Sequence, residues 1–171
     1  LTIPLDVQES AVDTSEIRED AYGDGRAERP AYADPKAIET AIELLRASER
    51  PLIVVANGAY TVQQDEIERL VETTGIPVFT EESARGIISD DHALCAGYAD
   101  GRVGDAAKSI READALLLLG KKLDYTISFG GPPTINPDTK IIQVEPAWEL
   151  VGAARDVDVT IVADPGAVVR Q

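Results

Sequence analysis

The sequence has very few of the residues on which several protein classes depend. It contains one cysteine, Cys95, and one histidine, His92, so neither an internal disulfide nor a zinc site built from cysteines or clustered histidines can form. No apolar run reaches the roughly 18 residues that a membrane span needs. No basic segment precedes an apolar stretch, as it would in a signal peptide. We therefore expect a cytoplasmic protein with no membrane partner.

Basic residues are also scarce. The chain of 171 residues carries 16 Lys and Arg against 31 Asp and Glu, which gives a formal net charge of −15. Such a chain lacks the basic surface that holds nucleic acid, so we expect no nucleic-acid partner. Many carboxylates with few lysines suit concentrated salt, where screening weakens their repulsion. Two interpretations stay open: a halophilic protein and an ordinary acidic cytosolic protein.

From residue 34 onward, short apolar runs alternate with amphipathic repeats. The pattern predicts strands at 52–56, 76–79, 113–119, 140–144 and 157–162, and helices at 35–50, 61–75, 103–112 and 165–171. Runs that are apolar throughout are typical of strands buried on both faces. The predicted fold class is therefore α/β: a doubly wound, mainly parallel, Rossmann-like sheet of about five or six strands, with helices on both faces.

The first 33 residues follow a different pattern. Residues 1–7 are predicted to form a strand that contains Pro4, and residues 8–33 are acidic with few large apolar side chains. The second stretch is typical of a solvated linker. Because the chain lacks an initiating Met and stops within a predicted helix, we expect it to be a piece of a longer protein.

Three segments resemble one family. They are LTIPLDVQ at 1–8, RPLIVVANGAY at 50–60, and LLLLGKKLD at 116–124 followed by KIIQVE at 140–145. In this order they resemble parts of thiamine-diphosphate enzymes of the acetolactate synthase, 2-hydroxyacyl-CoA lyase and oxalyl-CoA decarboxylase group. The resemblance implies that residues 1–33 end a pyrimidine-binding domain and continue as an acidic linker. Residues 34–171 would then form the central, nucleotide-binding-like domain.

The same resemblance implies what the longer protein does. It would be a lyase or transferase that uses thiamine diphosphate and magnesium and assembles as a dimer or tetramer. The activating glutamate and the metal-binding motif of the family belong to regions outside this chain. We therefore expect the chain by itself to be inactive, with no catalytic residue and no metal site. The segment 23–25, Gly-Asp-Gly, matches the start of the family's metal motif but lies in the linker, so we interpret it as linker.

The resemblance also points to FAD or ADP as a ligand of this domain. In parallel sheets of this kind the ligand crevice lies at the carboxyl ends of the strands. Gly58 there would let the backbone approach a pyrophosphate, Lys122 would supply a positive charge, and Glu145 could accept hydrogen bonds from ribose hydroxyls. The candidate cofactor-binding residues are Asn57, Gly58, Ala59, Arg85, Lys122, Asp124 and Glu145. Plainer alternatives stay open: a tight turn at 57–60, two solvated lysines at Lys121 and Lys122, and a helix cap at Glu145.

Other residues carry weaker signals. Arg102 resembles a nucleotide contact of the CoA-type relatives, and Asp164 resembles a family aspartate that helix capping explains equally well. The pair of His92 and Cys95 lacks an obvious third group to orient it, so we set nucleophilic catalysis aside. Trp148 is most simply a packing residue.

Three alternatives to a nucleotide-binding central domain stay open. The domain could be purely structural, with no nucleotide. It could bind NAD in an unrelated enzyme such as a sirtuin-like deacylase, although the missing G-x-G-x-x-G fingerprint and the missing cysteines of a zinc module argue against this. It could also carry FAD as an electron-transfer flavoprotein domain.

Overall fold

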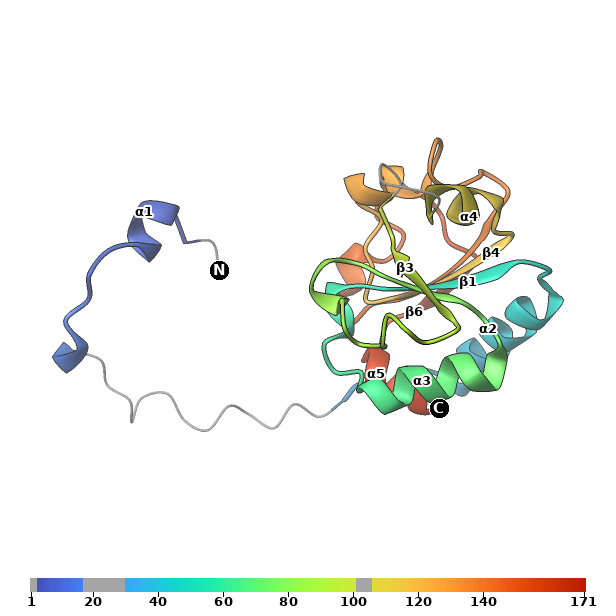
Figure 1. Ribbon diagram of the computed structural model, residues 1–171, viewed down its shortest axis with the longest axis horizontal. Helices are drawn as coiled ribbons and strands as arrows, with labels where there is room; N and C mark the ends of the chain where they lie inside the picture. The colour runs from blue at the N-terminus through green and yellow to red at the C-terminus, as the bar shows by residue number, and fades with distance from the viewer. Residues whose placement is uncertain (1–2, 17–29, 101–105) are drawn as a thin grey trace.

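The fold is known from a computed structural model, which describes residues 3–16, 30–100 and 106–171 (Figure 1). Its centre is a six-stranded sheet in which every neighbouring pair is parallel, in the order β3-β2-β1-β4-β5-β6. The strands are β1 Pro51–Val55, β2 Val78–Thr80, β3 Cys95–Tyr98, β4 Ala115–Leu119, β5 Lys140–Val144 and β6 Val159–Ile161. This is the strand order of a doubly wound Rossmann sheet, so the predicted fold class is confirmed.

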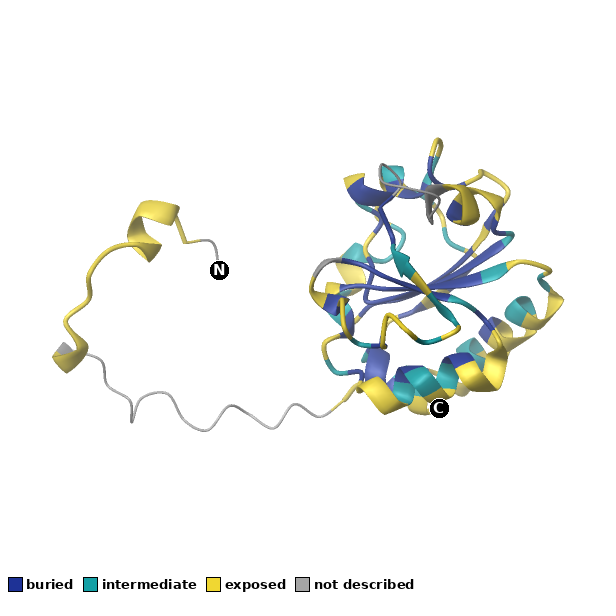
Figure 2. Ribbon diagram, viewed as in Figure 1, coloured by how far each residue is buried: buried dark blue, intermediate teal, exposed yellow. Residues whose placement is uncertain are grey.

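Helices cover both faces of the sheet. On one face lie α2 (Pro35–Ala47), α3 (Gln64–Thr74) and α5 (Pro165–Arg170), and on the other lies α4 (Ala106–Glu112) (Figure 1). Alternate residues of each strand enter one of two apolar clusters, because successive side chains of a strand point to opposite faces. The strands other than the edge strand β3 are accordingly the most buried part of the described chain (Figure 2). All five residues of β4 are buried, as a central parallel strand requires.

The helix ends mostly follow the sequence signals. Asp34 caps α2 by accepting a hydrogen bond from the Lys36 N–H (2.9 Å). Gly75 ends α3 with φ +70°, a left-handed conformation that favours glycine. The helix predicted at 61–75 begins later than Thr61, because Gln63 caps α3 in a capping box with Glu66.

Two predicted features of the fold are wrong. Within the segment predicted as a strand at 1–7, the described residues 3–7 form no strand: Leu5–Gln8 is a short exposed helix, α1, whose hydrogen bonds are local. A strand needs a neighbour to satisfy its backbone, and none of the described strands pairs with this segment. No element is predicted between the strand at 76–79 and the helix at 103–112, yet β3 lies there, because its sequence CAGY has too little apolar character to stand out.

The remaining predicted elements appear with shifted ends. Helix 103–112 is described only from Ala106, because residues 101–105 lie outside the described part of the chain. The division into a linker and a domain at residue 34 stays a prediction. Among the described residues, no helix is both long and apolar enough to cross a membrane.

Candidate functional site

The carboxyl ends of β1, β4 and β5 meet at one edge of the sheet. The Gly58 N–H donates to the Gly120 carbonyl (2.9 Å), and the Gly120 N–H donates to the Val144 carbonyl (2.8 Å). A Cβ atom on Gly58 would lie 2.8 Å from the Cα of Gly120, which is closer than real Cβ atoms approach. Gly120 has φ +61°, and a Cβ there would collide with the backbone of Gly58 and Ala59. The loops after β1 and β4 can therefore touch only because both positions are glycine.

Glu145 lies next to the contact between Gly58 and Gly120. It directly follows β5 and is only 5% exposed. Its Oε2 lies 3.1 Å from the position that a Cβ on Gly58 would take. Burial raises the pKa of the Glu145 carboxyl, although a hydrogen bond from the Ala147 N–H and the charge of Lys122 oppose the rise. The sheet edge thus holds a buried carboxylate with an exposed cation, Lys122, close enough to act on it.

Asn57, Ala59 and Arg85 line a neighbouring pocket of about 360 Å³ between the loops that follow β1 and β2. The Asn57 Oδ1 accepts hydrogen bonds from the N–H (3.1 Å) and the hydroxyl (2.7 Å) of Ser83, which joins these two loops. Arg85 pairs with Asp90 (3.3 Å) and lies 5.7 Å from the centre of the Tyr98 ring. Six of the seven predicted residues therefore form two adjacent groups rather than one cluster: Gly58, Lys122 and Glu145 in one, and Asn57, Ala59 and Arg85 in the other.

Asp124 belongs to neither group. Its Oδ1 accepts hydrogen bonds from the Lys121 ammonium (2.8 Å) and from the hydroxyl of Thr126 (2.6 Å). Burial would raise the pKa of the Asp124 carboxyl, but these hydrogen bonds and the charge of Lys121 outweigh burial and lower the pKa. In this conformation the Oδ1 of Asp124 is used within its own loop.

The sequence reasoning missed the partner of Lys121, which is Glu81. The Lys121 Nζ lies 2.6 Å from the Glu81 Oε2, and both side chains are almost fully buried. The alternative of two solvated lysines is therefore wrong for Lys121 and holds only for the exposed Lys122. One signal was present: two residues of opposite charge each follow a short apolar strand, and the carboxyl ends of parallel strands share an edge.

Comparison with known proteins identifies the family to which this fold belongs. The model of the family "Thiamine pyrophosphate enzyme, central domain" matches residues 38–171. The chain belongs to this family. It is 36% identical, over 99% of its length, to a 2-hydroxyacyl-CoA lyase of Oryza sativa subsp. japonica, and covers 30% of that protein. It is 31% identical to 2-hydroxyacyl-CoA lyase 1 of Homo sapiens over 82% of this chain and 24% of that protein.

Further similarities point the same way. Oxalyl-CoA decarboxylase of Escherichia coli (strain K12) is 31% identical over 76% of this chain and 22% of that protein. In the benzoylformate decarboxylase structure of Polynucleobacter necessarius, 98% of the chain aligns with 30% of that protein at a TM-score of 0.68 and 18% identity, which shows the shared fold. The chain spans less than a third of the length of each of these relatives.

The weaker predictions from the sequence have three different outcomes. Asp164 caps α5 by accepting from the Ala167 N–H (2.8 Å), so the capping alternative is confirmed. Trp148 is 74% exposed, so its interpretation as a packing residue is wrong. Arg102 and the segment 23–25 lie outside the described residues.

His92 and Cys95 show no sign of a nucleophilic pair. The His92 Nδ1 accepts a hydrogen bond from the Leu94 N–H (3.1 Å), and its Nε2 lies 3.7 Å from a carboxylate oxygen of Glu72. Neither contact involves the Cys95 thiol. Within residues 3–16, 30–100 and 106–171, no three His, Cys, Asp or Glu side chains gather where they could hold a metal ion.

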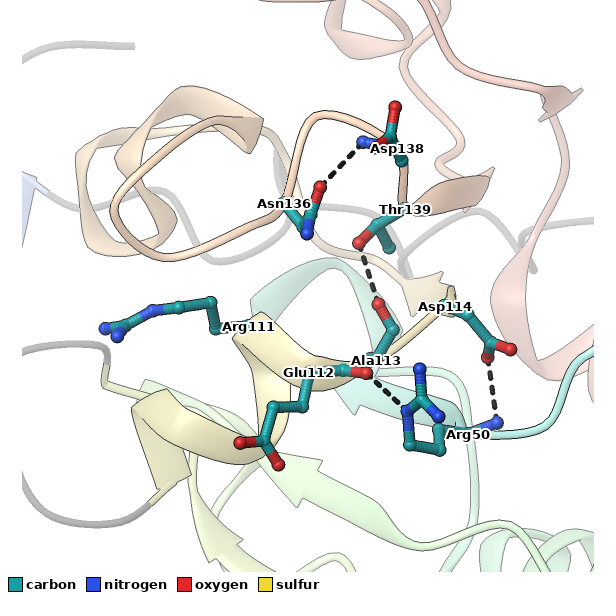
Figure 3. Close-up of a pocket in the computed structure, with 8 residues that line it drawn as sticks. All are labelled: Arg50, Arg111, Glu112, Ala113, Asp114, Asn136, Asp138 and Thr139. Atoms are coloured by element: carbon teal, nitrogen blue, oxygen red, sulfur yellow. Dashed lines mark hydrogen bonds between the residues drawn. The ribbon is translucent and has the colours of Figure 1, made fainter.

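The central domain has a second cavity at the opposite, amino-terminal edge of the sheet (Figure 3). It measures about 640 Å³. Asp114 accepts hydrogen bonds there from the N–H groups of Glu49 (2.7 Å) and Arg50 (2.9 Å). The side chain of Arg111 extends away from Arg50, so the two guanidinium groups do not converge on a common point (Figure 3). Ligands of such sheets bind at the carboxyl ends of the strands, so we place the candidate site at the other edge.

Proposed function

We propose that this chain is the central domain of a thiamine-diphosphate-dependent lyase or transferase, and that the carboxyl edge of its sheet binds an adenine nucleotide. The complete protein would hold thiamine diphosphate and magnesium through regions outside this chain, and the cofactor would supply carbanion chemistry there. It would assemble as a dimer or tetramer, and the 171-residue chain alone would be inactive. The names of the relatives, 2-hydroxyacyl-CoA lyase and oxalyl-CoA decarboxylase, favour acyl-CoA substrates.

The observation that carries the nucleotide proposal is the buried carboxylate of Glu145 under the contact between Gly58 and Gly120. This contact lies where the strand order reverses, between β1 and β4, which is the ligand crevice of doubly wound sheets. A buried carboxylate next to backbone that lacks side chains suits the two hydroxyls of a ribose. The exposed ammonium of Lys122 suits the adjoining phosphates.

Trp148 completes the proposed site. It lies three residues after Glu145 in the loop that follows β5, and its ring is largely exposed. A ring that is not needed for packing is available to stack on a base, and such stacking is worth about 1–3 kcal/mol per base. We therefore assign the adenine to the loop that follows β5.

Isothermal titration of the chain with ADP, CoA, FAD and NAD tests the proposal. Binding of ADP or CoA would support the acyl-CoA branch of the family, and binding of FAD alone would support the acetolactate synthase branch. The variant Glu145→Gln should weaken binding at least tenfold, because a hydrogen bond to a charged group contributes about 1.5–3 kcal/mol. The exposed Glu43 of α2 gives the matched control Glu43→Gln, which should leave the affinity unchanged.

The same titration tests the second candidate function, a structural domain without a nucleotide. One observation favours it: the contact of Gly58 with Gly120 and the low exposure of Glu145 leave little open space between them. If none of the four ligands produces heat at millimolar concentration, the nucleotide proposal is wrong and the scaffolding role remains. Equal weakening by Glu145→Gln and Glu43→Gln would show that the assigned position is wrong.

A further inference from the structure

A buried ion pair spans the same edge of the sheet. Glu81 directly follows β2 and Lys121 follows β4, and in the sheet β1 lies between these two strands. The Lys121 Nζ and the Glu81 Oε2 are 2.6 Å apart, and the side chains are 3% and 2% exposed. The pair therefore connects the ends of two strands, β2 and β4, that do not pair with each other in the sheet.

The number of carboxylates around this ion pair exceeds the number of ammonium groups, and the hydrogen bonding of Glu81 is incomplete. The ammonium of Lys121 has three donors and three acceptors, which are Glu81, Asp124 (2.8 Å) and Thr126 (2.8 Å). The second carboxylate oxygen of Glu81, Oε1, is buried, and none of the described residues donates a hydrogen bond to it. Two carboxylates thus share one ammonium, and one buried oxygen has lost water without gaining a donor from the described part of the chain. Replacing such a buried pair with apolar side chains is often neutral or stabilising, so stability does not explain its presence.

The pair does fix one particular loop, which we call the 120–126 loop. The side chain of Lys121 holds this loop to β2 through Glu81. The backbone holds it to β5, because the carbonyl of Lys121 accepts a hydrogen bond from the buried Gln143 Nε2 (3.1 Å). Gln143 also binds the loop that follows β5, since its Oε1 accepts from the Gly152 N–H (2.8 Å). Lys121 is thus held by its side chain to Glu81 and by its carbonyl to Gln143. Its neighbours in the chain are Gly120 and Lys122.

We propose that Glu81 and Lys121 are positioning residues of the nucleotide site. They act through the 120–126 loop, where they set the backbone of Gly120 against Gly58 and place the ammonium of Lys122 beside Glu145. This inference rests on the proposed function. It goes beyond it in assigning a role to two buried side chains that do not themselves touch the nucleotide.

The test is the double variant Glu81→Leu/Lys121→Met, which removes both charges and keeps similar volumes. We expect a melting temperature equal to or above that of the wild type. The amide protons of the 120–126 loop, such as those of Asp124 and Thr126, should exchange with solvent at least tenfold faster. The Kd for ADP should rise at least tenfold.

Two variants serve as controls. Glu81→Gln keeps the length of the side chain and an oxygen that accepts from Lys121, so amide exchange and Kd should stay within about threefold of the wild type. Asp65→Asn/Arg69→Gln removes an exposed ion pair of α3 (3.5 Å) and should change neither quantity.

The outcomes separate this inference from the proposed function. If the double variant keeps both the slow exchange of the loop and the wild-type Kd, the pair does not position the site. If exchange rises by the same factor throughout the sheet and the melting temperature falls, the pair is merely structural, and the inference is again wrong. If the wild type binds no nucleotide, the proposed function fails, and loop-specific exchange alone decides whether the pair fixes the 120–126 loop.

Discussion

At the scale of the residue, Gly58 offers a direct test of the contact between loops. In Gly58→Ala the new Cβ would lie 2.8 Å from both the Cα and the carbonyl oxygen of Gly120, and this backbone cannot move aside cheaply. We expect a loss of about 1–3 kcal/mol in the free energy of unfolding, measured by urea denaturation. Gly131→Ala is the control, because its nearest neighbour would be 3.6 Å away and its φ is negative. Equal effects of the two variants would contradict the assigned contact.

Glu145 gives a prediction that depends on pH. Burial raises the pKa of its carboxyl above the usual value of 4.5, so the folded chain binds this proton more readily than the unfolded chain does. The charged carboxylate therefore costs stability above the raised pKa, and the cost disappears as the pH falls below 4.5. Glu145→Gln should raise the melting temperature at pH 7 and should lose this advantage near pH 4. A variant less stable than the wild type at pH 7 would show that Lys122 and Ala147 more than offset the burial.

At the scale of the element, Asp114 links the turn before β1 to the start of β4. Burial opposes a low pKa, but the backbone N–H groups of Glu49 and Arg50 outweigh it and lower the pKa of Asp114 below 3.8. Its stabilising effect is therefore present above pH 3.8 and is lost as the pH falls through the lowered value. Asp114→Ala should cost about 1–2 kcal/mol at pH 7 in urea denaturation, and less at pH 3.

Asp138 lines the same cavity as Asp114 and provides the control (Figure 3). It is exposed, so Asp138→Ala should change the free energy of unfolding by less than about 0.5 kcal/mol. If the two variants were equally destabilising, the link between the turn and β4 would not be the cause.

The elements also show what a sequence can predict. A run such as Ala115–Leu119 predicts a buried strand, because a central parallel strand is covered on both faces and can bury five consecutive apolar side chains. β3 was not predicted from the sequence, because its four residues pack at the edge of the sheet with little apolar surface. The apolar residues of segment 1–7 and its resemblance to the end of the family's pyrimidine-binding domain both predict a strand, yet a strand depends on a neighbour that pairs with it.

The candidate site was predictable to the same degree. Glu145 directly follows β5, and Gly58 lies in the turn that follows β1, so their meeting at the carboxyl edge follows from a parallel sheet. The pairing of Glu81 with Lys121 joins positions 40 residues apart, and it depends on which strands flank β1. Sequence patterns place both residues at the carboxyl edge but leave the order of the strands open, so the signal indicates a shared edge and only the folded chain shows the pairing.

At the scale of the whole molecule, the net charge of −15 leads to a prediction about salt. Only five of the cationic residues are lysines, and one of these, Lys121, is buried, so few ammonium groups offset the carboxylates at the surface. The mutual repulsion of these carboxylates is felt over about 30 Å at 0.01 M salt and over about 3 Å at 1 M. If the chain is adapted to concentrated salt, its melting temperature should rise by several degrees between 0.01 M and 1 M KCl at pH 7. The rise should shrink near pH 4, where carboxylates take up protons and the repulsion weakens. Equal melting temperatures at pH 7 would identify an ordinary acidic protein, because self-repulsion would then contribute nothing measurable to its stability.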